Sequence, residues 1–512
     1  VKGSEMIHIG DNWIADVSNA DKNGIKSFLV EKPMALYRGE DLSIYAGDIL
    51  NSILHSGINH DLRWVSYGYL GYSAMEGLIA NKLFDSPFVY YNKESNFNCS
   101  PDVIGYTALG PYLFGVTNWI RQKAEQNKVR TIHFVARDGY VPMKAFEIFR
   151  KYNKKLPTTD YIYVSRKSMM FADIYKKEDV FSLTHKMNAK TTHSKIIKYF
   201  RPYLQNKFIK LDDSEILEHL GLNKNSGEKY FTTIFEFESF LSELFDLIDQ
   251  KKLNDNKTEL KNYFSQIIKK DDILFDIGYS GRQECALTKL LGFPVNSLYV
   301  HSNNEYLEKR QSIAHFKNEC FYDYKQFMTG VVREHVFMKL APSTIGYKNV
   351  NGTLEPVFEE YKIDTVTEII TKEMQNAALD FVDDYLKTFD GVFDYMYFRN
   401  QDLAWNFEYF ITWARDFDKL IMNSLKFEDD LGEGKTTTIS GYDFWKTELD
   451  RLVNNTNIYQ MWNQPAWVPE KRKATFKRRC ADFIFPYGTK RREFAKKVYY
   501  KFFAPFRKKK NK

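Results

Sequence analysis

The stretches TIHFVARDG (residues 131–139) and ILFDIGYSGR (residues 273–282) share one pattern, in which a short apolar run ends in charged residues and glycine. Short runs rich in Ile, Val and Phe that are bounded in this way predict buried strands. Helical spacing follows each stretch, from about Val141 to Tyr152 and up to Leu291, and further strands are predicted at 161–164 and 297–301. Strands that alternate with helices indicate a parallel sheet with helices on its faces.

Length and composition place this sheet in a larger chain. For 512 residues, two or three packed units are expected, and 44% hydrophobic and 27% charged residues are ordinary for a globular protein. The four cysteines contain no C-x-x-C pair and the histidines are scattered, which argues against a disulfide framework and a cysteine zinc site and favours a reducing cytoplasm. No run of about 18 apolar residues predicts a transmembrane helix.

The rest of the chain divides by pattern. Strands are predicted at 6–9 and 25–30 around a helix at 16–23, whereas residues 40–126 and 366–465 show mainly helical spacing. The chain opens at Val1 without an initiator methionine, so we expect an artificial start or a fragment of a longer reading frame. The predicted α/β organisation has five parts: an N-terminal α/β remnant (1–36), a helical connector (37–102), a Rossmann-like parallel α/β domain with a helical insertion (103–345), a mainly helical C-terminal region (346–465) and a basic tail (466–512).

Two acidic residues follow the first predicted strand, in Gly10-Asp11-Asn12-Trp13-Ile14-Ala15-Asp16. Such carboxylates can converge across a loop on one hard cation such as Mg²⁺, although an aspartate there can equally cap the helix. The segment resembles the fourth motif of the HAD-like phosphohydrolase superfamily, G-D-x-x-x-x-D. The resemblance implies that Asp11 is a Mg²⁺ ligand and Asp16 its supporting acid. It covers roughly the first 35 residues. The family's nucleophilic D-x-D, its Ser/Thr and its Lys precede this point in family order and are absent from this chain, so a metal-binding edge without a nucleophile is expected.

The two opening stretches supply the second candidate site. Open parallel sheets bind ligands at the carboxyl ends of their strands, and helix N-termini with nearby arginines favour phosphate. Asp138 and Asp276 are the candidate catalytic acids, which could also hold a metal or ribose hydroxyls. The candidate substrate-binding residues are Arg137, Gly139, Gly278, Ser280, Gly281 and Arg282. The alternative is ordinary capping with structural glycines. No hydrolytic serine is predicted, because Arg282 replaces the second glycine of a nucleophile elbow.

These stretches also carry a second resemblance. The patterns F-x-x-R-D-G, at residues 134–139, and D-I-G-x-x-G, at residues 276–281, resemble a region of predicted HAD-superfamily proteins from bacterial surface-polysaccharide loci. The resemblance implies a phosphorylated sugar or a nucleotide sugar as ligand. A weaker similarity to phosphoribosyltransferases fails, because the double acid and the Thr-Gly-x-Thr of that phosphate loop are missing.

The positive charge of the chain is concentrated in its last segment. Residues 471–512 contain 17 Lys and Arg against Asp482 and Glu493, which gives this tail a net charge of +15. Because the whole chain has a net charge of +7, the preceding residues carry −8. Phe494, Val498 and Phe502 recur at helical spacing, which predicts a basic amphipathic helix for an anionic membrane surface. A helix docked on the protein's own body is the alternative. No motif for specific nucleic-acid binding accompanies the acidic body.

Taken together, these patterns favour a peripheral protein on the cytoplasmic face of the membrane that acts in bacterial surface-polysaccharide assembly. As an enzyme, it would be related to HAD-like Mg²⁺-dependent phosphohydrolases or would transfer a phosphoryl or glycosyl group. The alternative is a non-catalytic adaptor that docks at the membrane beside partner glycosyltransferases.

Overall fold

The computed structural model describes much of residues 1–438. The described residues are 1–30, 32–33, 66–86, 95, 97–185, 191–231, 233–278, 280–302, 304–322, 330–360, 363–392, 400–413, 418, 420–421, 425–428 and 436–438. The predicted tail, 471–512, and most of the predicted connector, 37–102, lie outside these ranges.

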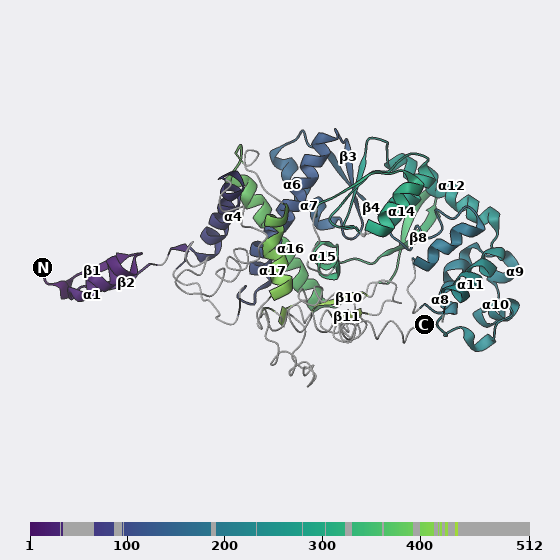
Figure 1. Ribbon diagram of the computed structural model, residues 1–512, viewed down its shortest axis with the longest axis horizontal. Helices are drawn as coiled ribbons and strands as arrows, with labels where there is room; N and C mark the ends of the chain where they lie inside the picture. Colours follow the sequence, from purple (N-terminus) through teal and green to yellow (C-terminus); the bar gives the residue numbers. More distant parts are fainter. Residues whose placement is uncertain are drawn as a thin grey trace, which may run out of the picture.

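A five-stranded parallel sheet forms the centre of the α/β fold, as the sequence predicts (Figure 1). The strand order is β4-β3-β5-β6-β7, so the chain runs outward in both directions from the pair β3 and β5. The strands are β3 (Thr131–Val135), β4 (Thr158–Ile162), β5 (Ile273–Asp276), β6 (Ser297–Tyr299) and β7 (Asn318–Cys320). Strand β4 begins three residues before the predicted 161, and β7 was not predicted, because Asn-Glu-Cys is no apolar run.

Alternating side chains of the strands enter two different cores, as the two-residue period of a strand requires. On one face, Ile132, Phe134 and Phe275 pack with α6, α7, α16 and α17. On the other face, Val135 and Leu274 pack with α12 and α13. These helices are α6 (Gly110–Gln126), α7 (Tyr140–Tyr152), α12 (Gln250–Ile267), α13 (Arg282–Leu291), α16 (Thr365–Thr388) and α17 (Asn400–Trp413). The sheet is therefore the middle layer of three.

The first of these cores crosses the predicted boundaries at 102/103 and 345/346. It joins Met75 and Ile79 of α4 (Ser66–Phe84) to residues of the sheet and to Phe381 and Phe407 of the two long C-terminal helices. Helices α16 and α17 confirm helical spacing after 366, but the short antiparallel strands β10 (Lys426–Glu428) and β11 (Thr436–Thr438) interrupt it. The C-terminal helices thus complete the core of the α/β unit.

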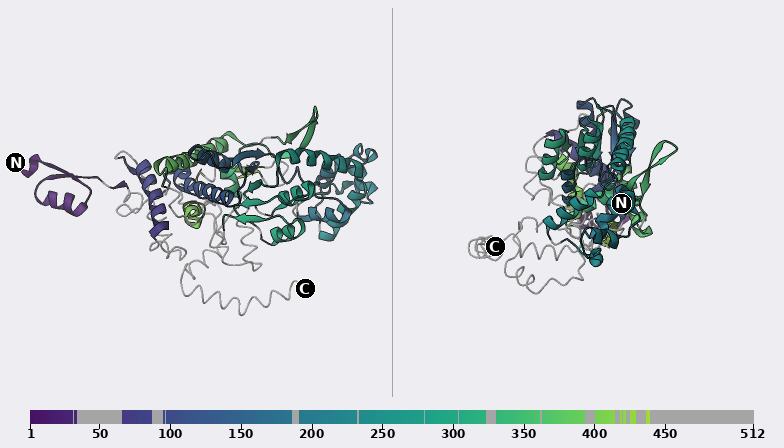
Figure 2. Two further views of the ribbon diagram at one scale, coloured as in Figure 1. Left: turned by 90° about the horizontal axis from the view of Figure 1, so that it is seen from above. Right: turned by 90° about the vertical axis from the view of Figure 1, so that its right-hand side faces the viewer.

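A helical insertion separates β4 from β5 and has a core of its own, built from residues between 170 and 253. Its helices are α8 (His193–Phe200), α9 (Asn206–Ile209), α10 (Asp213–His219), α11 (Ile234–Asp246) and the start of α12. Figure 2 shows the antiparallel hairpin of β8 (Thr344–Val350) and β9 (Thr353–Phe358), which projects from the part of the molecule that contains the sheet and the insertion. Three further helices of the body, among the described residues, are α5 (Pro101–Ile104), α14 (Asn304–Ala314) and α15 (Gly330–Phe337).

The N-terminal segment forms the predicted strand–loop–helix–strand unit. Strand β1 (Ile7–Gly10) pairs in parallel with β2 (Lys26–Leu29), and a helical stretch that ends in α1 (Asn19–Lys22) covers one face. On the other face Ile7, Ile9 and Phe28 are 68%, 64% and 57% exposed. This unit is a two-layer piece with one apolar sheet face uncovered within the described residues.

Membrane-spanning segments were also sought among the helices. Within the described part of the chain, none combines the length and the apolar character that crossing a bilayer requires.

Candidate functional site

The two candidate acids follow neighbouring strands at the centre of the sheet. Asp138 lies just beyond the end of β3, Asp276 is the last residue of β5, and the two strands pair with Phe134 opposite Phe275. From β3 the chain passes outward to β4 and later returns to β5 on the other side. Loops that diverge in this way leave a crevice at the carboxyl edge, where open α/β sheets bind ligands.

Glycines make the two turns at this edge possible. A side chain on Gly139 would meet the backbone of Val135, so only glycine lets α7 begin so close to β3. Gly278, with φ of +127°, lies directly against the carbonyl oxygen of His301. Gly281 is left-handed, with φ of +62°, and begins α13 without a capping side chain. These three glycines are therefore needed for the course of the backbone at the two turns. No side chain caps the backbone N–H groups at the start of α13.

The electrostatic field at the edge is dominated by acids, of which Asp276 and Glu284 are buried and Asp138 and Glu334 are partly buried. Burial and the nearby carboxylate of Glu334 raise the pKa of Asp138 to about 7, against the opposing effect of Arg137 and Arg166. Burial, then Glu284 and Asp138, raise the pKa of Asp276 well above its ordinary value. Like charges this close cannot all ionise, so the group retains protons near neutral pH.

Helix α15 supplies two of the neighbours that the sequence did not reveal. Its Arg333 forms a buried ion pair with Glu408 of α17, which fixes the orientation of the helix. Glu334 follows in the chain, and then His335, whose Nε2 lies 2.7 Å from Oγ1 of Thr371. Burial and the charge of Arg137 lower the pKa of His335 to about 4, so this imidazole is neutral at physiological pH. No sequence motif identifies these residues as neighbours of Asp138 and Asp276, because α15 is far from β3 and β5 in the sequence.

The remaining predicted residues lie at the start of α13. The carbonyl of Ser280 accepts a hydrogen bond of 2.8 Å from Nη1 of Arg310, which ties the loop to α14. Arg282 is the first residue of α13 and is partly buried. The structure thus brings Arg137, Asp138 and Asp276 into one electrostatic group and places Ser280 and Arg282 on the loop and helix that follow Asp276.

The predicted metal ligands of the N-terminal unit are engaged by other groups. Oδ2 of Asp11 lies 2.6 Å from Nζ of Lys32. Asp16 accepts a hydrogen bond of 2.8 Å from the N–H of Asn12, and its other oxygen is 2.9 Å from Nε2 of His8. No cluster of three or more His, Cys, Asp or Glu suited to a metal ion occurs among the described residues. Asp11 is exposed and Asp16 is partly buried, and the contacts of Asp16 organise the turn after β1.

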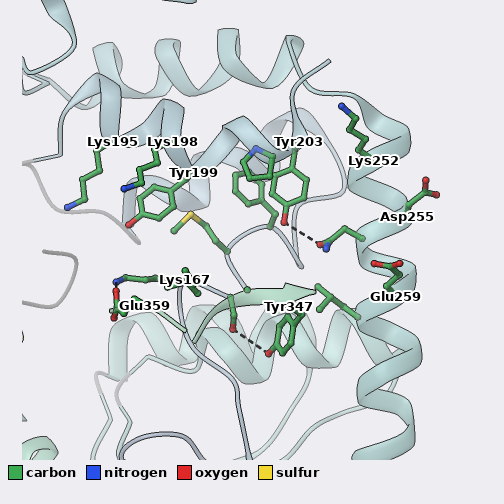
Figure 3. A pocket seen from close by; sticks show the side chains of 18 of the residues that line it. Lys167, Lys195, Lys198, Tyr199, Tyr203, Lys252, Asp255, Glu259, Tyr347 and Glu359 are labelled. Carbon is green, nitrogen blue, oxygen red and sulfur yellow. Dashed lines mark hydrogen bonds and ion pairs between the residues drawn. The ribbon is translucent and has the colours of Figure 1, made fainter. Parts of the chain in front are cut away.

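Beside the carboxyl edge a cleft of about 730 Å³ opens between the insertion and the β8–β9 hairpin (Figure 3). Figure 3 shows Lys195, Lys198 and the pair Lys167 and Glu359 at one end, with Asp255 and Glu259 at the other. Tyrosines line its middle: Tyr199, Tyr203 and Tyr347. None of the predicted site residues lines the cleft, and the nearest strand end contributes Lys167, from the loop after β4.

The cleft and the carboxyl edge are electrostatically linked. Nζ of Lys167 lies 2.6 Å from Oε2 of Glu359. Burial acts to raise the pKa of Glu359, but this ion pair, with smaller contributions from Ser343 and Arg137, lowers it. Arg137 therefore acts on Glu359 in the cleft and on Asp138 at the strand end. None of the acids of that group lines the cleft, so the charge of Arg137 is the link between the two places.

No protein-family model matches the sequence, and neither does any curated protein.

Proposed function

We propose that the chain acts in bacterial cell-surface polysaccharide biosynthesis, where it transfers a phosphoryl or glycosyl group of a phosphorylated sugar or nucleotide sugar. One observation carries the proposal: Asp138, Asp276 and Glu334 meet beside Arg137, where the strand order reverses. Ligand sites of open α/β sheets occur at this position. In this proposal residues 103–345 are a Rossmann-like domain, and residues 1–36 are the last part of a HAD-like module.

The acid group can supply the proton transfers that such reactions need. A carboxyl group with a pKa of about 7, as at Asp138, both donates and accepts protons near neutral pH. A pair of carboxyls that retains a proton provides one acid and one base, which suits departure of a phosphate and activation of an acceptor hydroxyl. Arg137 would hold the phosphate charge. No step is assigned to Mg²⁺, because Asp11 and Asp16 are already engaged by Lys32, His8 and Asn12.

The test is turnover of a sugar phosphate bond by the full chain. Release of UDP from UDP-glucose and of phosphate from glucose 1-phosphate would be followed with water as the acceptor. We expect Asp276→Asn to reduce the rate by about 10²–10⁴-fold, as the loss of an acid–base group does. The control is Asp271→Asn, an exposed aspartate just before β5, which should leave the rate unchanged. Equal rates for the Asp276 variant and the wild type would contradict the proposal.

Attachment to the inner face of the membrane is the second part of the proposal. It is supported by the 17 basic residues of 471–512 and by the apolar face through Phe494, Val498 and Phe502. Each Lys or Arg near an anionic leaflet contributes about 1 kcal/mol, and each inserted aromatic side chain about 1.5–3 kcal/mol. Changing the three apolar residues to Ser should sharply reduce co-sedimentation with anionic liposomes at unchanged charge. Equal binding by the triple variant, or stronger retention on duplex DNA than on vesicles, would exclude this part.

A further inference from the structure

The cleft beside the sheet has walls of opposite charge. Helix α8 contributes Lys195 and Lys198, which are three residues apart and therefore lie on one side of the helix. Helix α12 contributes Asp255 and Glu259, four residues apart and exposed. Lys252 of α12 does not neutralise this acidic end completely, because Leu204 O and Asn206 Oδ1 hold its Nζ at 2.9 and 2.7 Å. One end of the cleft thus carries three lysines together with Glu359, which is paired with Lys167, and Glu360, which follows it in the chain. The other end carries two carboxylates beside Lys252 (Figure 3).

Its middle is lined by aromatic rings whose hydroxyl groups are held in place. The hydroxyl of Tyr347 donates a hydrogen bond of 2.5 Å to the carbonyl of Tyr163, and that of Tyr203 donates one of 3.3 Å to Oδ1 of Asn256. Fixed hydroxyls leave the ring faces as amphipathic surfaces at little entropic cost. Such surfaces suit the C–H face of a sugar ring or the plane of a base.

The two ends match the two halves of one class of ligand. Ammonium groups bind phosphate oxygens through charge-assisted hydrogen bonds, which are stronger than bonds between neutral groups. Carboxylates only accept hydrogen bonds, so they suit the hydroxyl groups of a sugar and repel phosphate. A free nucleotide or inorganic phosphate would leave the acidic end unused, and a neutral sugar would leave the lysines unused. A volume of about 730 Å³ is also in the range of sites for molecules of this size.

We propose that this cleft binds a phosphorylated sugar, with the phosphate at Lys195 and Lys198 and the sugar hydroxyls toward Asp255 and Glu259. The inference rests on the proposed function and specifies how its substrate is held. The basic end adjoins the ion pair of Lys167 and Glu359, whose carboxylate also feels the charge of Arg137. The phosphate end therefore lies toward the acid group of Asp138 and Asp276.

Binding can be measured by calorimetry with four probes: UDP-glucose, glucose 1-phosphate, inorganic phosphate and glucose. The double variant Lys195→Ala/Lys198→Ala should weaken both phosphorylated sugars by about 10–100-fold, the range expected for lost hydrogen bonds to a charged group. Lys195→Arg/Lys198→Arg should retain most of the affinity. The control is Lys210→Ala/Lys251→Ala, two exposed lysines of the insertion that do not line the cleft. Thermal melting of each variant checks that the insertion still folds.

The acidic end is tested separately. Asp255→Asn/Glu259→Gln should weaken the two phosphorylated sugars by about tenfold and leave inorganic phosphate unaffected or bound more tightly, because a repelling charge is gone. Wild-type affinity for the sugar phosphates in both double variants, combined with a loss in Arg137→Ala, would overturn this inference and leave the proposed function standing. Binding through the cleft without any turnover that depends on Asp276 would uphold the inference and contradict the proposed chemistry. If neither phosphorylated sugar binds, both fail.

Discussion

Two pairs of aspartates follow strands in this molecule, and their surroundings differ completely. Asp11 lies on an exposed loop and Asp16 in the short helical stretch Trp13–Ser18 that follows it, where a lysine, a histidine and a backbone N–H contact them. Asp138 and Asp276 lie at the centre of a covered sheet, where burial and other carboxylates dominate. In sequence both pairs follow apolar strands, and glycine adjoins one member of each, Asp11 and Asp138. The comparison teaches that the side chains packed around a carboxylate, and not the sequence motif, raise the pKa of Asp138 and Asp276 and lower that of Asp16.

The largest difference between the two regions is expected in the free energy of unfolding that is lost when a glycine of each is replaced by alanine. Gly278→Ala places a side chain against the carbonyl of His301 in a backbone conformation that L residues rarely adopt, so we expect a loss of about 4 kcal/mol or more, or failure to fold. Gly24→Ala in the N-terminal unit also has a positive φ but open space around it, and should cost about 1 kcal/mol. Urea unfolding followed by tryptophan fluorescence measures both. Similar midpoints for the two variants would show that the loop after β5 is not tightly packed.

A smaller effect is expected from the proton held at Asp138. Its folded-state pKa of about 7 exceeds the ordinary value, so the folded state binds more protons than the unfolded state between about pH 4 and 7, and stability falls as pH rises through that window. Asp138→Asn removes this loss of stability. The free energy of unfolding of the variant minus that of the wild type should therefore be larger at pH 8 than at pH 5, by on the order of 1–2 kcal/mol. Denaturant unfolding at both pH values is the measurement. Asp271→Asn is the control, and parallel pH profiles for Asp138→Asn and wild type would refute the buried acid group.

The smallest effect concerns the exposed pair. The hydrogen bond from His8 is the main cause that lowers the pKa of Asp16 below its ordinary value, followed by the N–H of Asn12. His8→Ala should therefore raise the pKa of Asp16 toward that value and scarcely change unfolding. A carboxyl-detected NMR titration resolves the shift, with Asp21 as an internal control. An unchanged pKa in the variant would mean that the backbone alone sets the ionisation of Asp16.

The sequence predicted the central sheet because its strands are apolar and its loops are polar. Phe134 and Phe275 sit in such runs, and Asp138 and Asp276 had to lie side by side once β3 and β5 were neighbours. Strand β7 was missed because its residues are polar and partly exposed at the edge of the sheet. The predicted Mg²⁺ role of Asp11 remains without a matching group of ligands among the described residues.

The rest of the site could not be read from one chain because its parts are distant in sequence. Glu334 and His335 reach the acids only through the packing of α15 against α17, fixed by Arg333 and Glu408. The lysines of α8 and the acids of α12 are about 60 residues apart and face each other only when the insertion folds on its own core. Helical periodicity reports which face is apolar, and it does not report which helix lies opposite.

The separate core of the insertion has a consequence for how the protein opens. A region with its own core can unfold locally while the remainder stays intact. The cleft lies where two such regions meet: Phe171 belongs to the core of the insertion, whereas Leu260 belongs to the core beneath the sheet. A ligand that touches both walls couples the opening of one region to the other, since it binds only when both are folded. Binding of such a ligand should therefore slow amide hydrogen exchange across the whole insertion, including helices that the ligand does not contact.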